Sequence, residues 1–172
     1  MLKPSHGTVH ADGRIGYIPQ NSSLLEDATV EENLRFFARL SGGSLPSSLP
    51  FSVDAFKNKK VASLSGGMKM QVSIACAMLG DPPILLLDEP CASLDITFRE
   101  EMAALVFQWK EQGKTVLYVG HDPSEFHPFF DSVLFLTSQP KMYTREQLCC
   151  GGDDLYSFAH LYKSILENCK GE

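Results

Sequence analysis

Residues 84–87 form an unbroken apolar run between two prolines and two acidic residues, and this run constrains the fold more than any other segment. Such a run is typical of a strand buried on both faces of a parallel sheet. Residues 115–119 show the same pattern, and residues 14–18 and 133–136 are further candidate strands. Because helical patterns separate these strands, the sequence predicts an α/β fold with an open parallel sheet and helices on its faces.

Helices are expected after residues that can cap a helix N-terminus. Thr29, with Glu32 three residues later, forms a capping box, and Ser65 and Asp95 are candidate caps of two more helices. Residues 51–62 fit neither a helical nor a strand pattern. The apolar spacing predicts helices at residues 30–40, 66–79, 96–112, 124–130, 144–148 and 155–168.

The composition excludes several classes of protein. The chain has 172 residues, the length of one domain, and a net charge of −6, the wrong sign for neutralising nucleic-acid phosphates. No apolar run approaches the roughly 20 residues that cross a bilayer, and the N-terminus lacks a signal-peptide core. The five cysteines form no C-x-x-C pair, so we expect free thiols and no zinc site. We therefore expect a cytoplasmic protein without a nucleic-acid partner or direct membrane insertion.

Polar residues follow three of the predicted strands. Asp88 and Glu89 stand at the C-terminal end of the apolar run, where α/β sheets bind ligands. One carboxylate there suits Mg²⁺ held mainly by water and phosphate oxygens, and the next can orient or deprotonate a water. The pair also fits a solvated strand end. Gln20 and His121 follow two other strands, and each alone also fits a structural residue.

Ser65, Gly66 and Gly67 lie where the second helix is expected to begin. The two glycines free the backbone N–H groups, and the serine adds a hydroxyl, so this helix N-terminus can bind an anion. An ordinary capped helix with a tight turn explains the same residues.

Taken in chain order, these features resemble the ATP-binding-cassette (ABC) transporter ATPases. The order runs from Gln20 through Leu64-Ser65-Gly66-Gly67 and residues 84–90 to Ser93-Leu94-Asp95 and His121. The resemblance covers residues 7 to about 137, and its most specific part is the signature at residues 64–71, followed closely by the acidic strand. It implies a P-loop NTPase-like sheet, with ATP and Mg²⁺ as cofactors.

The resemblance also implies a domain organisation. Residues 1–137 would be a partial ABC ATPase domain, in which about 29–80 form a helical subdomain that carries the signature. Residues 138–172 would be a helical C-terminal extension.

The resemblance assigns catalytic and metal roles to four residues. Gln20 would sense Mg²⁺ and the transport partner, and Asp88 would serve the Mg²⁺ sphere. Glu89 would be the general base that polarises the attacking water, and His121 would lie near the γ-phosphate. The chemistry implied is phosphoryl transfer to water.

Four further residues would act across a dimer. Ser65, Gly66 and Gly67 would hold the γ-phosphate of ATP bound to the opposite subunit, and Asp95 would lie at the dimer seam. The partners implied are a second ABC ATPase subunit and a transmembrane permease.

The family's phosphate-binding (Walker A) loop, G-x-x-x-x-G-K-[ST], does not occur in the sequence. Gly113-Lys114-Thr115 resembles its end, but residue 108 is glutamine and a helix precedes the segment, so we interpret it as a helix C-cap. In intact relatives a strand, that loop and a helix precede a stretch resembling residues 3–9. The resemblance therefore implies an N-terminal truncation.

The truncation has two expected consequences. By resemblance, the first core strand belongs between residues 115–119 and 133–136, so facing backbone groups of these strands would lack partners and the sheet would be poorly stable. The missing loop is also the main grip on ATP, so we expect no tight nucleotide binding by this chain alone.

The function implied is the ATP-hydrolysing, energy-coupling subunit of a membrane transporter, peripheral to the membrane through a permease. Residues 21–34 resemble stand-alone subunits of bacterial exporters more than those of importers. The alternative is a catalytically degenerate half-site partner that lends its signature to another ABC subunit.

Overall fold

A three-stranded parallel sheet positions the candidate site. The computed structural model describes residues 6–170 except 47, 93, 137–138, 150–151 and 153, and it leaves the side chains of 168–170 undescribed. The strands are β1 (Ile15–Ile18), β2 (Ile84–Asp88) and β3 (Thr115–Val119), in the order β1-β2-β3. Ile18 pairs with Leu87, and Leu87 with Tyr118, so the strands end at a common edge. The predicted α/β class and parallel sheet are confirmed.

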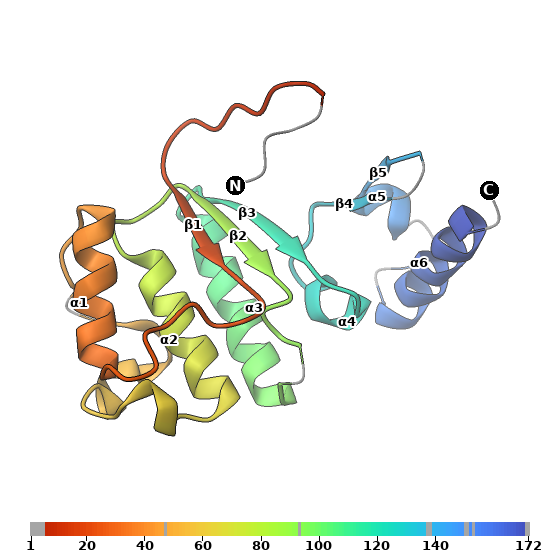
Figure 1. Ribbon diagram of the computed structural model, residues 1–172. Coiled ribbons are helices and arrows are strands. Elements are labelled where there is room, and N and C mark those ends of the chain that lie inside the picture. The colour runs from red at the N-terminus through yellow and green to blue at the C-terminus, as the bar shows by residue number, and fades with distance from the viewer. Residues whose placement is uncertain are drawn as a thin grey trace.

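Three long helices lie beside this sheet (Figure 1): α1 (Val30–Ser41), α2 (Gly66–Met78) and α3 (Ile96–Glu111). The capping box of Thr29 and Glu32 is present, and the side chains of Ser65 and Asp95 cap α2 and α3, as predicted. The segment without a prediction forms two 3₁₀ helices, Pro50–Phe56 and Val61–Ser63.

The two faces of the sheet differ in burial. Ile18, Leu85 and Leu87 are fully buried and share one core with side chains from α2 and α3. On the opposite face, Tyr17, Leu117 and Val119 are 53%, 59% and 46% exposed, although their neighbours in the strands are apolar. The expectation of burial on both faces is therefore wrong for residues 115–119, whereas Ile84 and Leu86 of residues 84–87 are partly buried on this face. In the described part of the chain, the long helices cover only one face.

The sheet is interrupted after β3. Strand β4 (Ser132–Phe135) pairs antiparallel with β5 (Lys141–Thr144) in a separate two-stranded sheet. Residues 133–136 thus do not join the parallel sheet as its fourth strand. Among the described residues, no strand pairs with the outer edge of β3, which agrees with the expected gap.

The C-terminal segment packs through aromatic side chains. It comprises α4 (Pro123–Phe126), shorter than predicted, together with α5 (Arg145–Leu148) and α6 (Leu155–Lys170). Phe130 stacks on Phe158 with ring centroids 4.9 Å apart, and Phe126 meets Phe158 edge-on at 6.0 Å. These contacts hold α6 against α4 (Figure 1). No described helix is both long and apolar enough to span a membrane.

Two of the described cysteines, Cys76 and Cys91, are free, as expected. Cys76 and Cys91 are buried and Cys149 is partly buried. Burial raises the pKa of the Cys76 thiol to about 12. Cys150 and the side chain of Cys169 lie outside the described residues.

Candidate functional site

The C-terminal edge of the sheet brings Gln20, Glu89 and His121 together. Gln20 lies just beyond β1, Glu89 directly follows β2, and His121 lies just beyond β3. Gln20 Nε2 donates to Glu89 Oε2 at 2.8 Å, and His121 Nε2 lies 2.6 Å from Glu89 Oε1. The ends of two flanking strands therefore hold both oxygens of one carboxylate. A group held in this way can orient a water or accept its proton.

The backbone of Glu89 is held in an unusual conformation. Its φ of 50° lies in the left-handed region, which costs a non-glycine residue about 1–2 kcal/mol. The N–H of Glu89 donates to Val119 O at 2.9 Å, which continues the bonding between β2 and β3 for one step beyond the strand. This bond fixes the turn that points the carboxylate toward Gln20 and His121.

Asp88 lies on the exposed face of the sheet, and it has a partner that the sequence analysis missed. The hydroxyl of Tyr17 donates to Asp88 Oδ2 at 3.2 Å. Loss of solvent around the phenol, together with the Asp88 carboxylate, raises the pKa of Tyr17. The alternation of side chains along β1 could have indicated this pair, because it places Tyr17 on the face opposite to the buried Ile18.

The oxygen donors at this edge suit a hard cation. Asp88 supplies a carboxylate. The amide oxygen of Gln20 is available to bind a cation, because the hydrogen bond to Glu89 uses the amide nitrogen. The described residues contain no group of three or more histidines, cysteines and acids that could enclose a metal ion. One carboxylate with an amide oxygen fits Mg²⁺, which retains waters and takes phosphate oxygens, and does not form an all-protein cage.

The start of α2 presents open backbone. The Ser65 hydroxyl accepts the N–H of Met68 at 3.2 Å. A Cβ added at Gly66 would meet nothing within 4 Å, and one at Gly67 would meet only Leu94 Cδ2, at 3.7 Å. The first turn of this helix is therefore accessible to an anion.

Asp95 caps α3 by accepting the N–H of Phe98 at 2.9 Å. Within the described ranges, no hydrogen bond or ion pair joins Asp95 or Ser65 to the group formed by Gln20, Glu89 and His121. The structure therefore brings together three of the site residues expected from the sequence, and no described hydrogen bond or ion pair links the start of α2 to them. Ser93, which belongs to the same motif as Asp95, lies outside the described residues.

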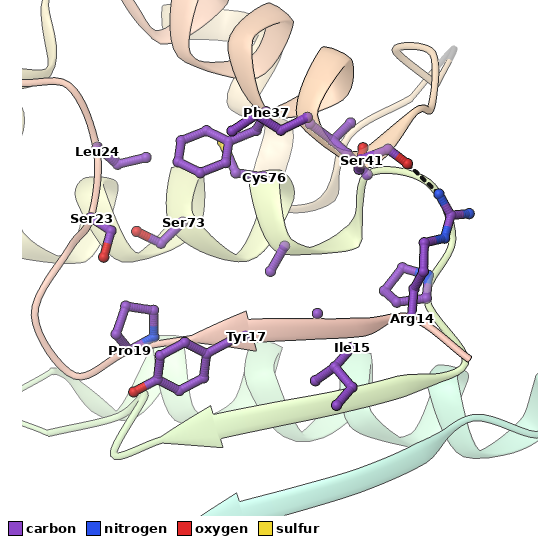
Figure 2. Close-up of a pocket in the computed structure, with 15 residues that line it drawn as sticks. Arg14, Ile15, Tyr17, Pro19, Ser23, Leu24, Phe37, Ser41, Ser73 and Cys76 are labelled. Carbon is purple, nitrogen blue, oxygen red and sulfur yellow. Dashed lines mark hydrogen bonds between the residues drawn. The ribbon is translucent and has the colours of Figure 1, made fainter. Parts of the chain in front are cut away.

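An apolar cavity of about 400 Å³ lies between β1 and the helices α1 and α2 (Figure 2). Leu24 and Phe37 line it, as do Cys76 of α2 and Pro19, the residue before Gln20. At one end of the cavity, Arg14 donates to two backbone carbonyls. One belongs to Ser41, the last residue of α1, and the other to Gly80, two residues after the end of α2. The sequence analysis identified neither the cavity nor Arg14, since both depend on how β1 packs beside two distant helices.

A profile of the ABC transporter family matches residues 2–92. The chain belongs to the ABC transporter family. This ABC chain is 30% identical over 163 residues to a taurine import ATP-binding protein of Jannaschia sp., covering 85% of the chain and 61% of that relative. It is 38% identical over 120 residues to a Nod factor export ATP-binding protein of Burkholderia pseudomallei, covering 65% of the chain and 40% of that relative.

Solved structures agree with the fold. The structure of an ATP binding subunit of an ABC transporter matches with a TM-score of 0.74 at 26% identity, covering 88% of the ABC chain and 68% of that structure. The chain spans about half the length of the two transport ATP-binding proteins named above. The expected family and P-loop NTPase-like fold are confirmed.

Proposed function

We propose that these 172 residues belong, as a truncated chain, to the ATP-binding and ATP-hydrolysing subunit that supplies energy to an ABC membrane transporter. The observation that carries this proposal is the group of Gln20, Glu89 and His121, in which two side chains hold both oxygens of one carboxylate at the ligand-binding edge of the sheet. Asp88 lies one residue away on the same edge.

Glu89 would act as the general base. Its carboxylate polarises the attacking water and takes up a proton, while the amide of Gln20 and the ring of His121 fix its direction. The His121 side chain is 85% exposed, so its ring can reach a phosphate beyond the edge. Asp88 and Gln20 would hold Mg²⁺, which neutralises charge on the phosphate oxygens when bound.

The signature residues would act in a dimer. Ser65, Gly66 and Gly67 present open backbone at the start of α2, and no described hydrogen bond joins them to the Glu89 carboxylate of their own chain. A second ABC ATPase subunit could therefore place its ATP against this surface, with Asp95 at the seam. In this proposal residues 1–137 are the ATPase part, about 29–80 its helical subdomain, and 138–172 an extension.

The cavity beside β1 would receive the permease. Its lining is mostly apolar and includes Pro19, next to Gln20. A cytoplasmic helix of a separate membrane subunit could thus contact the segment that carries Gln20. The relatives described above include one importer and one exporter by name, so we assign the direction of transport to the permease. The chain would be peripheral to the membrane on its cytoplasmic side.

The sequence favours one second candidate, because it contains no G-x-x-x-x-G-K-[ST] loop. In that case the chain is a degenerate half-site partner, whose signature completes the site of another ABC subunit. Its own Glu89 would then have no ATP to act on.

Two substitutions separate these functions in the assembly purified with its membrane partners. For the ATPase subunit, Glu89→Gln should lower ATP hydrolysis by about 10²-fold or more, since it removes the general base. For the half-site partner, Ser65→Ala should abolish hydrolysis while Glu89→Gln leaves it nearly unchanged. Ser63→Ala is the matched control, because the Ser63 hydroxyl bonds only Lys60 O within the described contacts. Purification without any permease would count against a transport role.

A further inference from the structure

Glu125 is a buried carboxylate that the proposed chemistry leaves unused. It lies in α4 and is 8% exposed. The Tyr118 hydroxyl donates to its Oε2 at 3.0 Å, and Arg99 Nη2 lies 3.6 Å from its Oε1. Burial raises the pKa of Glu125, and the tyrosine and the guanidinium act in the opposite direction. Arg99 and Tyr118 therefore compensate a carboxylate that would otherwise be costly to bury.

Arg99 also binds the residue that follows His121. Its Nη1 donates to Asp122 Oδ2 at 2.8 Å. The other Asp122 oxygen accepts from the N–H and hydroxyl of Ser124, at 2.9 and 2.7 Å. These bonds, the Ser124 hydroxyl first among them, hold the pKa of Asp122 below its usual value. One guanidinium thus binds both Asp122 and Glu125, at the two ends of the first turn of α4.

These side chains come from the three segments that carry Glu89, Asp95 and His121. Arg99 lies one turn beyond Asp95 in α3, and Tyr118 lies in β3 just before His121. Cys91, two residues after Glu89, is buried beside Tyr118, whose hydroxyl interacts with its thiol. We call these side chains the Arg99 cluster: Cys91, Arg99, Tyr118, Asp122 and Glu125.

We propose that Arg99 is a positioning residue that holds His121 against Glu89. The His121 ring is largely exposed, so packing does not fix it. The anchoring of Asp122, one residue later, limits where the His121 backbone can lie. Since Arg99 extends from the start of α3, it also ties the His121 segment to the segment of Asp95. The catalytic meaning of this link rests on the proposed function, whereas the link between Arg99 and His121 belongs to the chain alone.

The experiment is a long-range ¹H–¹⁵N correlation spectrum of the histidine rings in the ¹⁵N-labelled 172-residue chain. The Glu89→Gln variant serves as the reference: its spectrum gives the chemical shift of the His121 Nε2 resonance when the charged partner is absent. Arg99→Met should move this resonance at least halfway to that position. Lys110→Met is the matched control, since Lys110 lies in the same helix and binds Asp131 and Phe129 O at 2.7 and 2.8 Å, away from His121. It should leave the resonance in place.

Rescue distinguishes positioning from general damage. Arg99→Lys keeps a positive charge that can bind Asp122 but lacks the guanidinium fork that reaches Asp122 and Glu125 together, so it should return the His121 resonance part of the way to its wild-type position. An unchanged resonance in Arg99→Met, or an equal displacement in Lys110→Met, would overturn the proposal. If Arg99→Met does not fold, Asp122→Asn replaces it, since it removes the charge that Arg99 binds next to His121, and an unchanged resonance there has the same meaning. The spectrum requires no ATP, so failure of the proposed function alone would leave these results intact.

Discussion

Asn33 is completely buried in α1, yet its amide is fully bonded to backbone. Its Oδ1 accepts the N–H of Leu25 at 2.8 Å, and its Nδ2 donates to the carbonyls of Leu25 and Thr29 at 3.1 and 2.9 Å. Asn33→Leu leaves the Leu25 groups without these partners, so we expect the free energy of unfolding to fall by about 2–4 kcal/mol. Urea unfolding measures this. The exposed Asn58→Leu should change it by less than about 0.5 kcal/mol, and equal losses would contradict the argument.

Glu125 should give the stability of the chain a specific pH dependence. Burial raises its pKa in the folded chain above the ordinary value of 4.5, so the folded state binds this proton more tightly than the unfolded state. The stabilisation from this group is complete below the unfolded pKa and is lost as the pH rises through the folded pKa. Relative to Glu125→Gln, the wild-type chain should therefore lose stability as the pH rises above about 4.5.

Urea unfolding of both proteins from about pH 4 to about pH 7 measures the difference. Because other carboxylates titrate in both proteins, subtraction isolates Glu125. A difference that stays constant or grows in favour of the wild-type chain would contradict the raised pKa.

Local side chains were the part of the site that the sequence could predict. The caps at Thr29, Ser65 and Asp95 depend on residues within one helical turn, and all are present. The meeting of Gln20 with Glu89 follows from the rule that parallel strands end at one edge. The bonds of Tyr17 to Asp88 and of Arg99 to Glu125 join segments distant in sequence, and no local pattern indicates such pairs.

At the scale of elements, the sequence predicted where the strands lie along the chain but not how deeply their two faces are buried. An apolar run indicates a strand, but its burial depends on which elements cover the second face. Leu117 has an apolar side chain that is typical of a core residue, yet it is exposed to solvent here. The 3₁₀ helix Pro50–Phe56 was missed because Phe51 and Ser52 take positive φ values, 57° and 51°, without a glycine to signal them.

The difference between the faces can be measured with a pair of leucines in neighbouring strands. Leu87 is fully buried, so Leu87→Ala should lower the free energy of unfolding by about 2–5 kcal/mol. Leu117 is 59% exposed, and Leu117→Lys should change it by less than about 0.5 kcal/mol while reducing the binding of a hydrophobic dye. Urea unfolding and dye fluorescence provide the readouts. A large destabilisation by Leu117→Lys would show that this face is covered.

At the scale of the whole molecule, the chain should bind ATP poorly by itself. The loop and lysine that usually grip the phosphates do not occur in the 172 residues, and the open turn at Gly66 supplies only part of a phosphate site. Titration calorimetry of the purified chain with Mg²⁺ and ATP should show no saturable binding below about 1 mM. Binding with a micromolar dissociation constant would contradict this expectation. The same titration with a 172-residue Glu89→Gln chain controls for hydrolysis during the measurement.

The open edge of β3 has a consequence for the life of the protein in a cell. In the part of the chain that the structure describes, no strand pairs with this edge, and its backbone groups beside exposed Leu117 and Val119 are a template on which other chains can add strands. Chaperones and proteases act on such surfaces, so a copy without an element over this edge should be short-lived. The cellular amount of this chain would then follow the amount of the element that covers the β3 edge. Degradation of uncovered copies would keep the chain and that element in matched amounts.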